Sequence, residues 1–152
     1  MDMAWLYRFG FFLFLLLGSA HPPARAQDQN QNLVVIGNGK GVPAELKMAQ
    51  FKSIMKGEKL RWPDGSKVVI ALLKTTTPVG QSTSQKVYRM SANELNKYWL
   101  ALVFQGKADA PNFFNSEAEL AEFVAQTTGA IGVVNQPTAS SKTIAIDGKK
   151  FI

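Results

Sequence analysis

The sequence predicts an α/β domain in which a mixed sheet is flanked by helices. Short runs of apolar, β-branched residues alternate with amphipathic segments along the chain, as strands and helices do when they follow one another. Residues 67–73, Lys-Val-Val-Ile-Ala-Leu-Leu, lack the alternation of a half-exposed strand, so a strand covered on both faces is expected there. Two capping boxes, Ser91-x-x-Glu94 and Ser116-x-x-Glu119, mark helix starts because their side chains satisfy free backbone amides.

The N-terminal residues are expected to be an export signal. Arg8 precedes an apolar stretch over 9–17, and small residues follow it. Cleavage is possible after Ala20 or after Ala26, and we expect it after Ala26 because Ala-Arg-Ala has the small-x-small pattern of such sites. A retained membrane anchor is the alternative, but the apolar core is shorter than the ~20 residues that span a bilayer. Residues 1–26 are therefore predicted to be a signal peptide, and the mature protein to be periplasmic or secreted, without a stable membrane anchor.

The predicted domain covers residues 33–152, and the polar residues 27–32 before it are expected to be a flexible lead-in. A buried strand is predicted at 33–36, because four apolar residues end there in a glycine-rich turn. Pro43 suits the first turn of a helix and Gly57 suits the position after a helix end. A helix is therefore expected between them.

The rest of the domain is expected to hold three helices, a strand and a hairpin. A loop over 74–82, rich in Thr, Pro and Gly, separates the apolar strand from a helix that begins near Ser82. The two capping boxes begin helices that end near Gly106 and Gly129, since glycine suits the left-handed position after a helix. The remaining elements are a loop around Phe113-Phe114, a strand over 130–134 and a hairpin over 143–152 with its turn at Asp147-Gly148.

The sequence lacks the side chains that most catalytic and metal sites use. It contains no cysteine, and its one histidine, His21, lies in the predicted signal peptide. The mature domain therefore has neither the usual general base nor the usual zinc ligands, so we expect no enzyme activity, no metal and no cofactor. The net charge of +6 favours anionic partners, but the lysines are spread along the chain, so nucleic acid is not an expected partner.

Hydroxyl side chains gathered around Ser82 predict an anion-binding site. A helix N-terminus offers unpaired N–H groups and a partial positive charge, which favour phosphate or a similar oxyanion. Basic side chains in the first turns of that helix would add charge-assisted hydrogen bonds. The alternative is that one serine caps the helix while the basic residues face water. The residues predicted to bind the anion are Gln81, Ser82, Thr83, Ser84, Lys86 and Arg89.

Three further motifs are better explained by structure than by chemistry. The glycine-rich run at 37–41 lacks the last glycine of a dinucleotide fingerprint. Ser53-x-x-Lys56 has the spacing of a penicillin-interacting nucleophile, but the companion motifs of those enzymes are missing. The carboxylates at 117–122 stand where a helix dipole and a capping box favour them.

Three segments together resemble the phosphate-type substrate-binding proteins of bacterial ABC importers. The first, over 51–65, contains Phe-Lys-Ser-Ile-Met-Lys-Gly and Trp-Pro-Asp-Gly. The second, over 98–107, contains Tyr-Trp and Phe-Gln-Gly-Lys, and the third, over 124–133, ends in Gly-Ala-Ile-Gly-Val. The resemblance covers residues 33–148 and implies a single lobe of the periplasmic-binding-protein fold, in which two lobes clamp a ligand between them.

The resemblance implies a periplasmic solute-binding-like domain that holds phosphate or a similar oxyanion and catalyses no reaction. Family members carry an Arg, an acidic residue and a Ser-Gly-Thr-Thr run at the strand-to-helix junction. Here the junction is the hydroxyl-rich run 74–83, in which Ser82-Thr83 takes the corresponding place. Because a lone lobe leaves its anion contacts in water, weak binding, or a homodimer that rebuilds a cleft, is expected. The alternative is a non-catalytic protein-interaction module derived from such a lobe, with Phe113-Phe114 in its contact surface.

Overall fold

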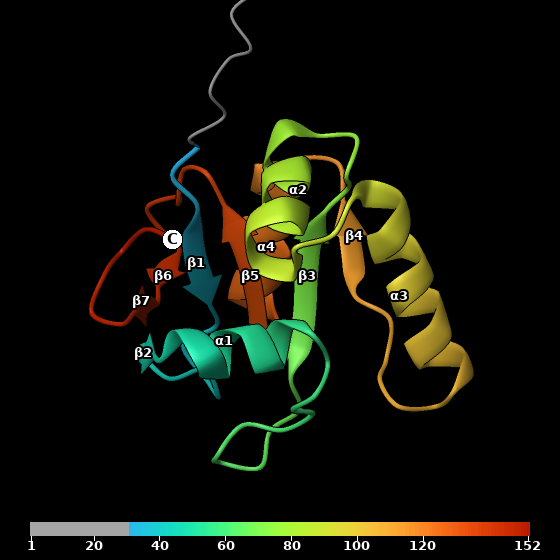
Figure 1. Ribbon diagram of the computed structural model, residues 1–152. Coiled ribbons are helices and arrows are strands. Elements are labelled where there is room, and N and C mark those ends of the chain that lie inside the picture. The colour runs from blue at the N-terminus through green and yellow to red at the C-terminus, as the bar shows by residue number, and fades with distance from the viewer. Residues whose placement is uncertain (1–30) are drawn as a thin grey trace, which may run out of the picture.

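A computed structural model describes residues 31–152, which form a five-stranded sheet with helices on both faces (Figure 1). The predicted signal peptide and most of the predicted lead-in lie outside the described residues. The strands lie in the order β4-β3-β5-β1-β6. They are β1 (Val34–Gly37), β3 (Val69–Leu73), β4 (Asn112–Phe114), β5 (Ala130–Val134) and β6 (Lys142–Thr143). A separate parallel pair joins β2 (Glu45–Leu46) to β7 (Ala145–Ile146).

Helices connect the strands, and both predicted capping-box helices are present. The helical elements are α1 (Met48–Met55), α2 (Pro78–Thr83), the π-helical turn η1 (Ser84–Tyr88), α3 (Ala92–Phe104) and α4 (Glu117–Gln126). Ser91 and Glu94 cap α3 reciprocally. At the start of α4, Ser116 Oγ accepts from Glu119 N at 3.2 Å, while the Glu119 carboxylate accepts from Asn115 N rather than from Ser116 N.

The sheet is mixed, as the sequence predicted, because β1 runs against its neighbours. β3 is parallel to β4 and β5, whereas β1 is antiparallel to β5 and β6. α1 and α2 cross one face of the sheet and α4 lies behind the other (Figure 1). The apolar run predicted as a covered strand is therefore the interior strand β3, although its pairing begins at Val69.

The core lies between the sheet and these helices. α1 buries Phe51 and Ile54, and α4 buries Leu120 and Val124, as their apolar periodicity predicted. Gly129 allows two parts of the backbone to approach closely. Its φ is +76°, and a Cβ at this position would lie 2.1 Å from Lys67 O, just before β3.

Three predicted elements differ from the structure. The first helix begins at Met48 rather than at Pro43, because the backbone of 45–46 pairs with β7 instead of entering the helix. Phe113-Phe114 is not a loop: it belongs to the edge strand β4, paired in parallel with β3. The Asp147-Gly148 turn is present, with φ of 49° and 75°, and Ile146 pairs with Lys149 across it, but the pairing stops there: β6 and β7 before the turn pair with β1 and β2, and no strand follows it.

Candidate functional site

The carboxyl ends of β3 and β4 form the edge where the sheet offers a ligand site. The two strands are parallel neighbours, and Lys74 N donates to Phe114 O at 3.0 Å just beyond β3. After β3 the chain turns into α2 on one face of the sheet, and after β4 it turns into α4 on the other face (Figure 1). In open α/β sheets ligands bind where neighbouring connections diverge in this way, because the divergence leaves a crevice beyond the strand ends.

Helix α2 begins at this edge. Its N-cap is Thr77, whose Oγ1 accepts from Gly80 N at 3.0 Å and donates to Lys74 O at 2.8 Å. Pro78 occupies the first turn, where its missing N–H is tolerated. The predicted start near Ser82 is therefore wrong, since Ser82 lies in the last turn of α2. The Thr-Pro pair at 77–78 is the sequence signal that marks the true start.

The first turn of α2 packs directly on the end of β3. A Cβ on Gly80 would lie 2.1 Å from Lys74 O and 2.8 Å from Leu73 O, distances that real Cβ atoms do not adopt. Glycine therefore allows the start of the helix to lie against the strand end.

A cavity of about 300 Å³ lies beside this edge. It is lined by three residues of the loop between β3 and α2, one of α3 and one of β4, namely Lys74, Thr75, Thr76, Asn96 and Phe113. Lys74 and Thr76 are exposed, and Thr75 is half-buried. The lining thus brings one cation, two hydroxyls and a side-chain amide together, which are the donor groups that an oxyanion accepts hydrogen bonds from. None of these five residues belongs to the predicted anion-binding set, because that set assumes a helix that begins near Ser82.

One carboxylate also lies at the carboxyl edge, on the first turn of α4. Glu117 Oε2 accepts from Asn135 N and Gln136 N, both at 3.0 Å. These bonds join the start of α4 to the loop after β5. Glu117 is therefore explained by a structural role, in agreement with the sequence interpretation of the carboxylates at 117–122.

Three of the six predicted anion-binding residues are buried. Ser82, Thr83 and Ser84 are only 3%, 3% and 1% exposed. Thr83 Oγ1 donates to Val79 O at 2.8 Å, and Ser84 Oγ donates to Met90 O at 2.7 Å. Both hydroxyls therefore donate to backbone carbonyl groups of the chain. The Thr83 bond stabilises the junction of α2 with η1, and the Ser84 bond stabilises the end of η1.

The other three predicted residues are accessible but lie apart from the β3 edge. Gln81 is exposed on α2. Lys86 and Arg89 stand at the end of η1, where Lys86 Nζ donates to Gln31 O at 2.8 Å and Arg89 has the left-handed φ of 59°. Both line a cavity that also contains Lys52 of α1. The structure therefore separates the six residues, and their role in anion binding stays a prediction.

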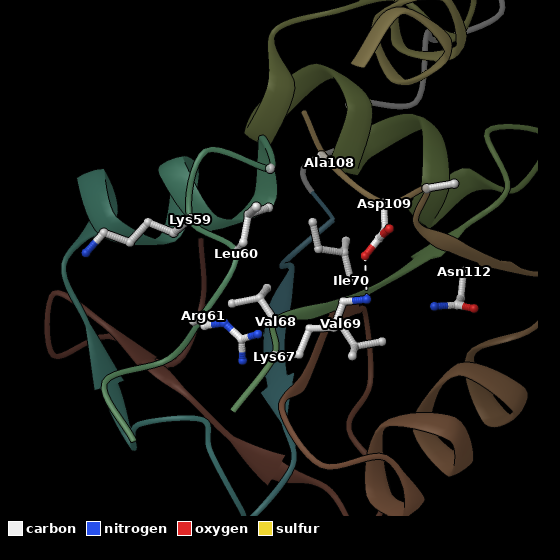
Figure 2. A pocket seen from close by; sticks show the side chains of 12 residues that line it. Lys59, Leu60, Arg61, Lys67, Val68, Val69, Ile70, Ala108, Asp109 and Asn112 are labelled. Atoms are coloured by element: carbon white, nitrogen blue, oxygen red, sulfur yellow. Dashed lines mark ion pairs between the residues drawn. The ribbon is translucent and has the colours of Figure 1, made fainter. Parts of the chain in front are cut away.

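A second basic cavity, of about 310 Å³, lies at the opposite edge, where β3 and β4 begin (Figure 2). Lys59, Arg61 and Lys67 line it together with Asp109. Lys67 forms an ion pair with Asp109, and Arg61 donates to Gly65 O at 2.8 Å. The ion-paired side chains are 61% and 73% exposed, so the pair adds little stability. Because Arg61 and Lys67 have partners and the cavity lies at the amino ends of the strands, it fits an oxyanion less well than the carboxyl edge does.

Within residues 31–152, no group of His, Cys, Asp or Glu side chains is arranged to hold a metal ion. In the same part of the chain, no helix combines the length and the apolar composition needed to cross a membrane.

Solved structures of phosphate-binding transport proteins share this fold, although no protein-family model matches the sequence and no curated protein is similar to it. An ABC-type phosphate transport receptor from Vibrio cholerae has a TM-score of 0.60 and 17% identity, over 80% of this chain and 48% of its own. A putative phosphate ABC transporter substrate-binding protein with bound phosphate, from Clostridium perfringens, has a TM-score of 0.59 and 14% identity, over 78% of this chain and 46% of its own.

PstS from Borrelia burgdorferi gives a similar match, with a TM-score of 0.56 and 13% identity over 78% of this chain and 48% of its own. The chain thus spans about half the length of the solved structures that it matches. The resemblance found in the sequence is confirmed for the fold: the chain is an α/β domain similar to a single lobe of the phosphate-type substrate-binding proteins.

Proposed function

We propose that this protein is a non-catalytic, solute-binding-like domain that binds phosphate or a similar small oxyanion at the carboxyl ends of β3 and β4. The observation that carries the proposal is the cavity lined by Lys74, Thr75 and Thr76, the residues that connect the end of β3 to α2. A neighbour with the same fold was solved with bound phosphate, which supports the choice of anion.

The chemistry of this edge suits an oxyanion. Thr75 and Thr76 line the cavity and supply hydroxyl donors, and Lys74 lines it beside them. Lys74 supplies a mobile positive charge, which attracts an anion without fixing its orientation. Asn96 adds an amide from α3, so the donors come from two separate elements.

Binding at this edge is expected to be weak. Lys74 and Thr76 are exposed, so water competes for each hydrogen bond and the surrounding dielectric is high. A dissociation constant on the order of millimolar corresponds to about −4 kcal/mol, which a few solvent-exposed contacts can supply.

Calorimetric titration of the full-length chain with inorganic phosphate tests the proposal. Phosphate should release or absorb heat at millimolar concentration, and Lys74→Gln and Thr75→Val should each weaken binding about threefold to tenfold, since each removes one contact of about 1 kcal/mol. Lys97→Gln, which removes an exposed lysine of α3, is the matched control and should leave the affinity unchanged. No heat at millimolar phosphate, or equal affinity for Lys74→Gln, would contradict the proposal.

The residues predicted from the sequence are tested in the same titration. Ser82→Ala and Thr83→Ala should abolish phosphate binding if the original cluster forms the site. They should leave the affinity unchanged if the anion lies at the β3 end, because the Thr83 hydroxyl is bonded within α2. Ser82→Ala is the more informative of the two variants. Because Ser82 is buried, this substitution removes no group that an anion in solvent could reach.

A further inference from the structure

A separate cavity of about 410 Å³ lies in the seam between α1, η1 and the last residues of the chain. Its apolar part consists of Met48, Val87 and Ile152, and its charged part of Lys52, Lys86 and Arg89. No residue of this lining belongs to the cavity beside β3 and β4. The seam is therefore an independent candidate site, and it does not rest on the phosphate proposal.

The lining is unusual in its charge. Three cations surround the cavity, and no Asp or Glu side chain lines it. α1, η1 and residues 149–152 contain no acidic residue, and Lys149 and Lys150 add further positive charge to the last segment. One acidic side chain lies next to this seam: the Asp147 carboxylate accepts from Met48 N at 3.3 Å. The three lining cations outnumber this nearby carboxylate, and such an excess of positive charge attracts an anion.

The backbone holds the cations in place. The π-helical turn is a rare geometry that is enriched at functional sites, and it carries Lys86. Lys86 Nζ donates to Gln31 O at 2.8 Å, which restrains the amine. Arg89 adopts φ 59°, a conformation that glycine or asparagine occupies more easily.

We propose that this seam binds a small anionic amphiphile, a molecule with one phosphate or carboxylate head and a short alkyl or aryl portion. The head lies among Lys52, Lys86 and Arg89, while the apolar portion covers Met48, Val87 and Ile152. The volume lies within the range of small-molecule sites, which are concave, mostly apolar and provided with a few polar groups that fix the ligand's orientation.

Calorimetric titration of the full-length chain with octyl phosphate tests the inference, with inorganic phosphate and octyl glucoside as probes for the head and the tail alone. Octyl phosphate should bind at least tenfold more tightly than either probe, because only octyl phosphate uses both parts of the seam. Lys52→Gln and Arg89→Gly should each weaken octyl phosphate binding about fivefold or more, because each removes one charged contact. Lys97→Gln should leave it unchanged.

Two controls separate this site from the others. Arg89→Gly relieves a left-handed arginine, so its unfolding temperature should equal or exceed that of the wild type, and lost binding cannot come from unfolding. Lys74→Gln should leave octyl phosphate binding intact. If Lys74→Gln weakens it and Lys52→Gln does not, the ligand lies at the β3 edge and the seam inference is overturned while the phosphate proposal stands.

The remaining outcomes are equally decisive. Octyl glucoside binding as tightly as octyl phosphate would overturn the inference, because the cations would then contribute nothing. Sedimentation with phosphatidylglycerol vesicles that depends on Lys52, without binding of soluble octyl phosphate, would overturn it in favour of contact with an anionic membrane surface.

Discussion

Two tyrosine hydroxyls hold the carbonyl end of α1. Tyr88 Oη donates to Met55 O and Tyr98 Oη donates to Lys56 O, both at 2.6 Å. The two rings pack edge-to-face with Trp99, with centroid distances of 6.3 and 5.5 Å. Helix ends leave carbonyl oxygens without partners, so these hydroxyls supply the missing donors from another part of the chain. The partners of these hydroxyls depend on the tertiary structure, so no local pattern in the sequence indicates them.

Tyr88 should make the protein sensitive to alkaline pH. Burial raises the pKa of its phenol because the interior disfavours the phenolate. The folded pKa lies above the unfolded value of about 10, so the stabilisation is full below pH 10 and falls as the pH rises above it, by about 1.4 kcal/mol per pH unit. Tyr88→Phe should remove most of this slope, and should cost about 1–2 kcal/mol at neutral pH because Met55 O loses its donor.

Urea unfolding between pH 8 and pH 11 measures this effect. Tyr98→Phe is the matched control, because Tyr98 is only half-buried although burial also raises its pKa. A slope that persists unchanged in Tyr88→Phe would show that other groups control the alkaline loss of stability.

At the scale of the elements, the decisive contact is the one between the start of α2 and the end of β3. Gly80→Ala should destabilise the fold by about 3 kcal/mol or more, because its Cβ would meet Lys74 O and the backbone has no side chain to rotate away. Gly39→Ala, in a turn where a Cβ meets nothing within 4 Å, should change stability by less than about 0.5 kcal/mol. Thermal unfolding compares the two variants, and equal stabilities would refute the close packing of α2 on β3.

Elements with strong local signals were predictable, and those set by tertiary pairing were not. The capping boxes located α3 and α4, and unbroken apolar runs located β3 and β5. Strand β2 has two residues and exists because β7 lies beside it, so no local pattern could indicate it. The expectation of a loop at β4 is wrong because this three-residue strand depends on its pairing with β3, and Phe114 packs on Phe123 of α4 with ring centroids 5.0 Å apart.

The candidate site was predictable in kind but not in position. Hydroxyl residues occur at 75–77 and again at 82–84, and both runs suit a helix start. Pro78 indicates that the helix starts at the first run, because proline is favoured in the first turn of a helix and disfavoured in its interior. The second run is instead buried in the continuation of the helix, where its hydroxyls donate to carbonyl oxygens of the chain. The cluster of Lys52 with Lys86 and Arg89 joins distant segments, so only the fold brings it together.

For the whole molecule, export remains a prediction that one measurement decides. We expect the chain, when produced with its N-terminus intact in a secreting bacterium, to lose residues 1–26 and to begin at Gln27. Intact-mass spectrometry of the periplasmic fraction identifies the terminus, and Ala26→Asp should block cleavage at that site because the position before the cut requires a small neutral residue. A product that begins at His21 would instead identify the site after Ala20.

The placing of β1 has a consequence for the order in which the molecule can assemble. β1 is wholly buried, and both of its neighbours, β5 and β6, come from the last quarter of the chain. On the ribosome, the segment Val-Val-Ile-Gly must therefore wait without a partner while about a hundred further residues are synthesised, and closing so long a loop is entropically costly. The sheet can be completed only after β5 and β6 have been synthesised, so β1 stays unpaired until then.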